Sequence, residues 1–287
     1  MISLSDKNSN EMIEIRQLWS DCFHDSEGFM NYYFNNIVKK NKIVVMKENK
    51  KVVGMIHLNP YVFSKDGKRI IRTYYIVGVA VGEAYRREGR MKKMMEYVAA
   101  DMEEEHIPFV YLWPKDVHYY ESMGYKTVTN IDRVILKKEN LKKFAELLAT
   151  DDVDLGYMKL FPELYRALYS GNEFSAELAS ENGRFIKSVR GEHNIGSFSM
   201  LKNEDIISVE HFCPVESLKQ LIAELIEQLL KNGDFKQAEI SIDRRLTDCL
   251  GKSKDAVEIN EDHVYMVKIL KDTPDKIWND CLFTEVV

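Results

Sequence analysis

The chain has 287 residues, of which 45% are apolar and 30% charged, and its formal net charge at pH 7 is −6. This balance is typical of a soluble globular protein of one large domain or two ordinary ones, and no segment reaches the roughly 18 unbroken apolar residues of a membrane span. The acidic excess argues against a broad nucleic-acid-binding surface and is compatible with a cationic substrate such as an amine.

The first residues, MISLSDKNSNEMIEI, carry acids and Asn where a signal peptide has a basic start and an apolar run. We therefore expect a cytoplasmic protein without a membrane partner. The cysteines show no CxxC or Cys/His spacing, so we expect reduced thiols and no metal site. The sequence leaves the oligomeric state open, a homo-oligomer included.

The order of elements in the first half predicts an α+β domain over residues 1–137. Apolar spacing indicates helices over residues 10–22 and 28–38, with a polar cap at Asp25-Ser26. KIVVM, VVGMIHLNPYVF and RIIRTYYIVGVAV indicate three antiparallel strands joined by polar turns. A loop, a helix from Arg90 to about Glu105, the strand PFVYLW, the short helix DVHYYESM and the closing strand YKTVTNIDRVIL follow. This order predicts one βαβ crossover at the centre.

The second half predicts a smaller α+β domain over residues 161–287. Residues 138–160 are charged and mostly helical, which indicates a connector. After them we expect a helix in ELYRALYS and strands in RFIKSVR, GSFSML and DIISVEHF. An amphipathic helix, VESLKQLIAELIEQLLKNG, two strands, QAEISID and HVYMVKIL, and the tail IWNDCLFTEVV complete the chain.

The most informative segment is the loop GEAYRREGR, which follows the strand VGVAV and opens into the long helix. Such a junction points free backbone N–H groups and a helix dipole at one spot, which suits a pyrophosphate. Gly89 leaves room for an anion, and Arg86, Arg87 and Arg90 can add charge-assisted bonds. The segment lacks the patterns of a nucleotide P-loop and of a dinucleotide fingerprint. The alternative is an ordinary crossover whose arginines are solvated.

This stretch, Arg86-Arg87-Glu88-Gly89-Arg90-Met91, resembles the acetyl-CoA signature of the GNAT superfamily of N-acetyltransferases, Arg/Gln-x-x-Gly-x-Gly/Ala, and departs from it at Met91. The VAV strand and the opening LWSDCFHDSEGFMNYYF are similar to the Eis-like (enhanced intracellular survival) bacterial acetyltransferases. The resemblance covers about the first half of the chain. For cofactor binding it implies Val79, Ala80, Val81, Arg86, Arg87, Glu88, Gly89, Arg90 and Met91.

The resemblance implies a GNAT fold, acetyl-CoA as cofactor, and transfer of an acetyl group to a primary amine of a small molecule or peptide. The alternative is a non-catalytic acyl-CoA-binding or scaffold protein that retains the cofactor loop. For the second domain two interpretations stay open, a degenerate GNAT-like half and a sterol-carrier-like module.

The second marker is Tyr120, in the run Tyr119-Tyr120-Glu121-Ser122-Met123-Gly124-Tyr125. In the superfamily a Tyr four residues before a Gly-Tyr turn protonates the departing coenzyme A thiolate, and the resemblance implies this role here. A phenol suits it because the hydroxyl stays protonated at neutral pH. The alternative is a packing residue with its hydroxyl at the surface.

The general base is not apparent, because the strand RIIRTYYIVGVAV contains no carboxylate. A water chain is one alternative, and an acid beside the amine, Asp25 or Glu27, is another. The resemblance to Eis-like enzymes implies a third, the C-terminal carboxylate of Val287. Asp25 is also a candidate helix cap, and the tail is equally compatible with an ordinary terminal strand.

Overall fold

The structure is a computed structural model that describes residues 1–65, 68–154, 165–169, 184–190, 193–270 and 281–282. The chain divides into two compact units. The first comprises residues 1–63, 69–127 and 266–277, and the second comprises residues 64–68, 128–265 and 278–287. Both units combine a sheet with helices, so the predicted α+β class is confirmed.

The first unit contains a mixed sheet whose first five strands are neighbours in chain order. They are β1 (Ile2–Leu4), β2 (Lys42–Glu48), β3 (Lys51–Lys65), β4 (Lys68–Val81) and β5 (Phe109–Leu112). β2 pairs antiparallel with β1 and with β3, whereas β4 and β5 are parallel. The parallel pair requires a crossover, which is the long helix predicted from the sequence.

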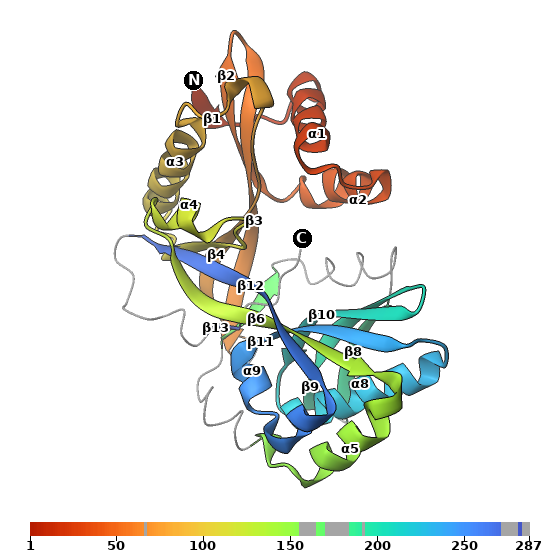
Figure 1. Cartoon of the computed structure of the whole chain (residues 1–287). Coiled ribbons are helices and arrows are strands. Elements are labelled where there is room, and N and C mark those ends of the chain that lie inside the picture. The colour runs from red at the N-terminus through yellow and green to blue at the C-terminus, as the bar shows by residue number, and fades with distance from the viewer. Residues whose placement is uncertain (66–67, 155–164, 170–183, 191–192, 271–280, 283–287) are drawn as a thin grey trace. The chain divides into compact units, whose positions relative to one another are not determined.

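That helix, α3 (Arg90–Glu104), lies on one side of the strands, and α1 (Ser9–Phe23) and α2 (Glu27–Tyr32) lie on the other (Figure 1). Two short elements complete the unit, the 3-10 turn η2 (Glu83–Tyr85) and the helix α4 (Val117–Glu121). The buried side of α3 consists of Met94, Met95, Val98, Ala99 and Met102.

The two N-terminal helices begin at polar caps. The side chain of Asn8 accepts a hydrogen bond from the Glu11 amide at the start of α1, and that of Ser26 accepts one from the Phe29 amide at the start of α2. Ser26, not Asp25, is therefore the cap of the second helix. α2 continues into a π-helical turn, η1 (Tyr33–Ile37).

The second unit contains further strands and its own hydrophobic core. β8 (Arg184–Arg190), β9 (His193–Asn203) and β10 (Ile206–Pro214) pair antiparallel, and β10 pairs parallel with β11 (Gln237–Asp243). The helix α8 (Leu218–Asn232) makes this second parallel crossover. The remaining elements are η3 (Lys138–Asn140), α5 (Leu141–Thr150), β7 (Tyr165–Tyr169), α9 (Arg244–Asp248), η4 (Gly251–Ala256) and β13 (Cys281–Leu282).

Two strands, β6 (Lys126–Lys137) and β12 (Glu258–Ile269), pair with strands from the other half of the chain. β6 follows α4, but its residues 131–137 pair antiparallel with β11 of the second unit. β12 follows α9, but Met266–Ile269 pair antiparallel with β5 of the first unit. The units are therefore interleaved in sequence, unlike the predicted consecutive domains 1–137 and 161–287.

Two elements differ from the sequence expectations because long-range packing decides them. The expected connector, residues 138–160, contains α5, whose Leu141, Phe144 and Leu148 belong to the hydrophobic core of the second unit. The expected helix ELYRALYS contains strand β7, which pairs parallel with β13. A partner strand distant in sequence outweighs the helical spacing of so short a segment.

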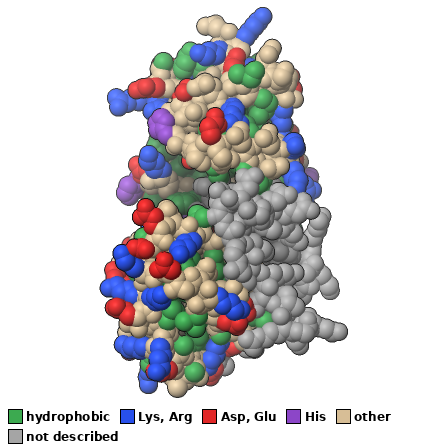
Figure 2. All heavy atoms as spheres, turned by 90° about the vertical axis from the view of Figure 1, so that its right-hand side faces the viewer, with side chains coloured by type: hydrophobic (Ala, Val, Ile, Leu, Met, Phe, Trp, Pro, Cys, Tyr) green, Lys and Arg blue, Asp and Glu red, His purple; other side chains and the backbone are tan. Residues whose placement is uncertain are grey.

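On the face shown in Figure 2, basic and acidic side chains of the described residues lie interspersed, and no basic stripe gathers there. None of the helices in the described part of the chain has the length and apolar character needed to cross a membrane.

Candidate active site

The end of β4 supplies the first wall of a cavity. Gly78 has a positive φ of 61°, which interrupts the regular extended backbone, and Val79, Ala80 and Val81 follow it. The amide of Gly82 then donates to the Val53 carbonyl at 2.9 Å, which fixes the end of β4 against β3. The position at which the loop begins is therefore fixed by the end of β4.

The loop after β4 leaves the N-terminus of α3 open. Arg87 and Gly89 both have positive φ, 66° and 70°, and a Cβ placed on Gly89 would meet nothing within 4 Å. α3 begins at Arg90 without a side-chain cap. The first amides of a helix have no partner within it, so these groups and the positive end of the helix dipole are available to an anion.

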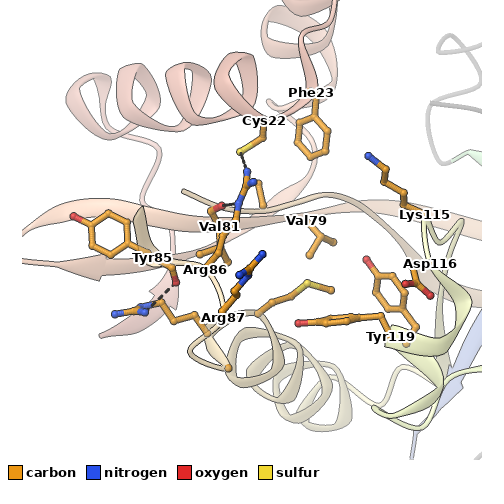
Figure 3. Close-up of a pocket in the computed structure, with 15 residues that line it drawn as sticks. Cys22, Phe23, Val79, Val81, Tyr85, Arg86, Arg87, Lys115, Asp116 and Tyr119 are labelled. Atoms are coloured by element: carbon orange, nitrogen blue, oxygen red, sulfur yellow. Dashed lines mark hydrogen bonds between the residues drawn. The ribbon is translucent and has the colours of Figure 1, made fainter. Parts of the chain in front are cut away.

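The three arginines of the loop have different surroundings. Arg86 donates from Nε to the Val81 carbonyl at 2.9 Å, and its Nη2 lies 3.6 Å from the Cys22 sulfur. Arg87 has no hydrogen-bond or ion-pair partner within the described parts of the chain, and its guanidinium lies inside the cavity (Figure 3). Arg87 is therefore the loop cation that is free to meet a ligand.

Arg90 is bound on several sides. Its Nε lies 2.8 Å from Glu48 Oε1, its Nη1 2.6 Å from Glu88 Oε2, and the same Nη1 donates to the Tyr85 carbonyl at 2.9 Å. The hydrogen bonds to Glu48 and Glu88 raise the pKa of Arg90. Arg90 thus stabilises the loop, and Glu88 forms an ion pair with it and is absent from the cavity wall.

The cavity has a volume of about 540 Å³ and runs from the loop to α1 and α4 (Figure 3). Eight of the nine residues predicted to bind the cofactor line it, all but Glu88, together with Tyr120. The other lining residues are Cys22, Phe23, Tyr85, Lys115, Asp116 and Tyr119. No local sequence pattern marks the two α1 residues, since Cys22 and Phe23 lie more than fifty residues before the loop.

Tyr120, on the helix α4, lines the same cavity as the loop. Asp116 caps α4 by accepting from the His118 amide at 3.0 Å, and Tyr125 packs edge-on against the Tyr120 ring with centroids 5.7 Å apart. Burial, with a smaller effect of Tyr119, raises the pKa of Tyr120 to about 12. The hydroxyl is therefore protonated throughout the physiological range.

The sequence of the first unit matches the family model of the acetyltransferase (GNAT) domain over residues 4–128. Residues 4–128 are a GNAT acetyltransferase domain. No curated protein has a significant sequence match to the chain.

Solved structures share the fold of nearly the whole chain. A probable N-acyltransferase from Enterococcus faecalis V583 is 13% identical, with a TM-score of 0.70, 94% of this chain covered and 73% of that one. A GCN5-related N-acetyltransferase from Anabaena variabilis is 14% identical, with a TM-score of 0.69 and the same coverage. Eis1 from Mycobacterium abscessus is 9% identical, with a TM-score of 0.63, and is covered to 73%. At these identities the likeness concerns the fold, which agrees with the resemblance to Eis-like proteins.

The two acids proposed beside the amine lie outside the cavity wall of the GNAT domain. Asp25 accepts a hydrogen bond from Trp19 Nε1 at 2.8 Å, and Glu27 pairs with Arg16 at 2.9 Å. Neither is among the lining residues. Val287, the third candidate, lies outside the described residues.

His57, on β3, is fully buried within the GNAT domain and does not line the cavity. Its Nδ1 lies 3.3 Å from both the Tyr33 hydroxyl and Asn41 Nδ2. Burial lowers the pKa of His57 to about 3, with a smaller effect of Lys7. The imidazole is therefore neutral and forms part of a buried polar cluster.

Proposed function

We propose that the protein transfers an acetyl group from acetyl-CoA to a primary amine of a small molecule or peptide. The observation that carries this proposal is the position of Arg87, the open N-terminus of α3 and Tyr120 on the wall of one cavity. The first two suit an anionic cofactor, and the third is an acid placed to complete the reaction.

The cavity residues fit coenzyme A. The uncapped helix start and the absence of a side chain at Gly89 suit the close approach of a pyrophosphate, and Arg87 can donate to its oxygens. Val79, Ala80 and Val81 lie at the strand end where an extended pantetheine would bond to backbone groups.

In the proposed reaction acetyl-CoA supplies the acetyl group as a thioester. The amine nitrogen forms a bond to the acyl carbon, the C–S bond breaks, and the nitrogen loses a proton to solvent. Tyr120 donates its proton to the departing sulfur and is reprotonated from water. The raised pKa of Tyr120, about 12, keeps the acid form available at neutral pH.

We propose that Asp116 faces the amine. Among the described residues that line the cavity it is the one carboxylate, and it lies at the N-cap of α4, four residues before Tyr120. Residues four apart lie on the same side of a helix, so both can approach the reacting nitrogen. An ionised carboxylate would attract the cationic amine before its proton is lost, a role that β4 cannot fill because it has no acid.

We further propose that the second unit is a degenerate GNAT-like half. Its order β10–α8–β11–α9–β12 repeats the order β4–α3–β5–α4–β6, with the same parallel pair on either side of the long helix. The N-terminus of α8, however, is filled: Asp154 accepts from Ser217 Oγ at 2.7 Å and from the Lys219 amide at 2.9 Å. A carboxylate at this position excludes a phosphate, and the repeat favours this interpretation over a sterol-carrier-like module.

Coenzyme A release, measured across polyamines, aminoglycosides, amino acids and peptide N-termini, tests the enzyme proposal. Tyr120→Phe should lower kcat by a factor on the order of 10²–10⁴ while coenzyme A binding persists. Tyr97→Phe, a tyrosine of α3 outside the cavity wall, is the matched control. Coenzyme A binding without release on any amine would favour the non-catalytic binding protein, for which the missing strand carboxylate is the supporting observation.

A further inference from the structure

Trp19 of α1 packs directly on the backbone of β4. A Cβ placed on Gly78 would lie 2.3 Å from Trp19 Cζ3 and 3.0 Å from Cε3 and Cη2, so only a glycine admits the indole here. Gly78 is also the residue with the positive φ that interrupts β4. The indole therefore covers the one irregular position of the strand, and Val79, the next residue, lines the cavity.

The opposite edge of the indole is held by the segment between α1 and α2. Trp19 is only 2% exposed, and its Nε1 donates to Asp25 Oδ2 at 2.8 Å. A buried indole N–H needs an acceptor, and no other hydrogen bond of this N–H is seen among the described residues. The Trp19 ring also packs against Tyr33 and Phe23, with centroids 4.7 Å and 5.0 Å away, and Phe23 lines the cavity.

We propose that Asp25 is a positioning residue, which holds the Trp19 indole against Gly78 and so fixes the backbone of Val79 for the cofactor. This inference rests on the proposed function. In this proposal Asp25 does not contact the amine, contrary to the expectation from the sequence. Its carboxylate affects cofactor binding through the position of Trp19. Without this hydrogen bond the indole can shift. The backbone conformation at Gly78 is then no longer held by the packed ring.

The two roles of Asp25 predict different kinetic effects. Asp25→Ala should raise the KM for acetyl-CoA by roughly 2- to 10-fold, the effect of one hydrogen bond, and leave the KM for the amine unchanged. Asp25→Asn keeps a carbonyl oxygen as acceptor and should restore most of the affinity. Asp21→Ala is the control, because Asp21 is a surface carboxylate on α1, the helix of Trp19, and accepts from Gln17 Nε2 at 2.7 Å.

Trp19→Phe gives an independent measurement, since it removes the N–H donor. The KM for acetyl-CoA should rise at least as much as in Asp25→Ala, and the double variant should show no further increase, because the two residues act through one contact. Additive effects of the two substitutions would contradict the proposal, as would an effect of Asp25→Ala on the KM of the amine alone.

Calorimetric titration with coenzyme A separates this inference from the proposed function. If the wild-type protein does not bind coenzyme A, the proposed function fails. If the wild type binds and folded Asp25→Ala binds with the same Kd, the proposed function stands and the positioning role of Asp25 is wrong. A several-fold weaker Kd in Asp25→Ala, recovered in Asp25→Asn, is the expected result.

Discussion

Arg90 donates from Nε to Glu48 Oε1 at 2.8 Å and thereby joins the first residue of α3 to the last residue of β2. The sequence pattern predicts that the Arg90 guanidinium binds a phosphate. In the structure most of its hydrogen bonds are made within the protein instead. Arg87, three residues earlier, has a strained backbone and no partner in the described part of the chain. Within the loop, Arg90 is therefore held by the fold, whereas Arg87 lines the cavity without a partner among the described residues.

Arg87→Ala is expected to weaken cofactor binding without loss of stability, because the side chain makes no contact that holds the fold. One charge-assisted hydrogen bond to phosphate corresponds to about a 10- to 100-fold increase in the Kd of coenzyme A. Calorimetry and a thermal melt measure the two quantities. Arg72→Ala, an exposed arginine of β4 outside the cavity wall, controls for net charge, and equal Kd values in the two variants would contradict the assignment.

Gly89→Ala should destabilise the protein by about 1–2 kcal/mol, the cost of a positive φ at a residue with a Cβ. The new methyl group meets no atom within 4 Å, so the cost is conformational and not steric. Urea unfolding measures it. Gly28→Ala also meets nothing within 4 Å, but lies inside helix α2 and should be neutral or stabilising. A decrease in the free energy of unfolding as large in Gly28→Ala as in Gly89→Ala would refute this explanation.

Asp116→Asn tests the proposed amine contact with little change in structure, because Asn caps a helix about as well as Asp. The loss of the charge should raise the KM of a cationic amine by roughly 2- to 5-fold, the range of a solvent-exposed ion pair. The KM of acetyl-CoA should not change. Steady-state kinetics with both substrates varied decides this, and an effect confined to acetyl-CoA would assign Asp116 to the cofactor.

His57 should make stability depend on pH in the acid range. Its pKa falls from 6.5 to about 3 in the folded protein, so below pH 6.5 the unfolded chain binds a proton that the folded one does not. The free energy of unfolding should decrease as pH falls from 6.5 towards 3, by up to about 1.4 kcal/mol per pH unit. Urea unfolding of His57→Gln between pH 4 and 7 should lack this slope. His118→Gln, at a side chain 91% exposed, should retain it.

Phe144→Ala tests whether α5 belongs to the core of the second unit. The side chain is 3% exposed, and truncation of a core Phe costs about 3–5 kcal/mol. Lys142→Ala, two residues earlier on α5 with a side chain 89% exposed, should cost little. Chemical unfolding followed by circular dichroism measures both. If the two variants are equally stable, α5 does not belong to the core, and the predicted connector role of residues 138–160 is favoured.

The sequence alone determined the features that are local in the chain. The α+β class, the crossover helix, the open loop around Gly89 and the short helix with Tyr120 each follow from spacing within about fifteen residues. The family resemblance predicted nine residues that bind the cofactor, and eight of them line one cavity with Tyr120. Each of these features depends on residues within one strand, one loop or one helix. Apolar periodicity and the positions of glycines are therefore sufficient to predict them.

Only the tertiary structure decided which distant segments meet. It paired β6 with β11 and β12 with β5, formed strand β7 within ELYRALYS, and brought Phe23 and Asp116 to the cavity. It also paired the Trp19 indole with Asp25, beyond the end of α1, and Arg90 with Glu48 of β2. Strand partners and ion pairs depend on side chains far apart in sequence, and no local pattern records them, because their energies arise only when the chain has folded.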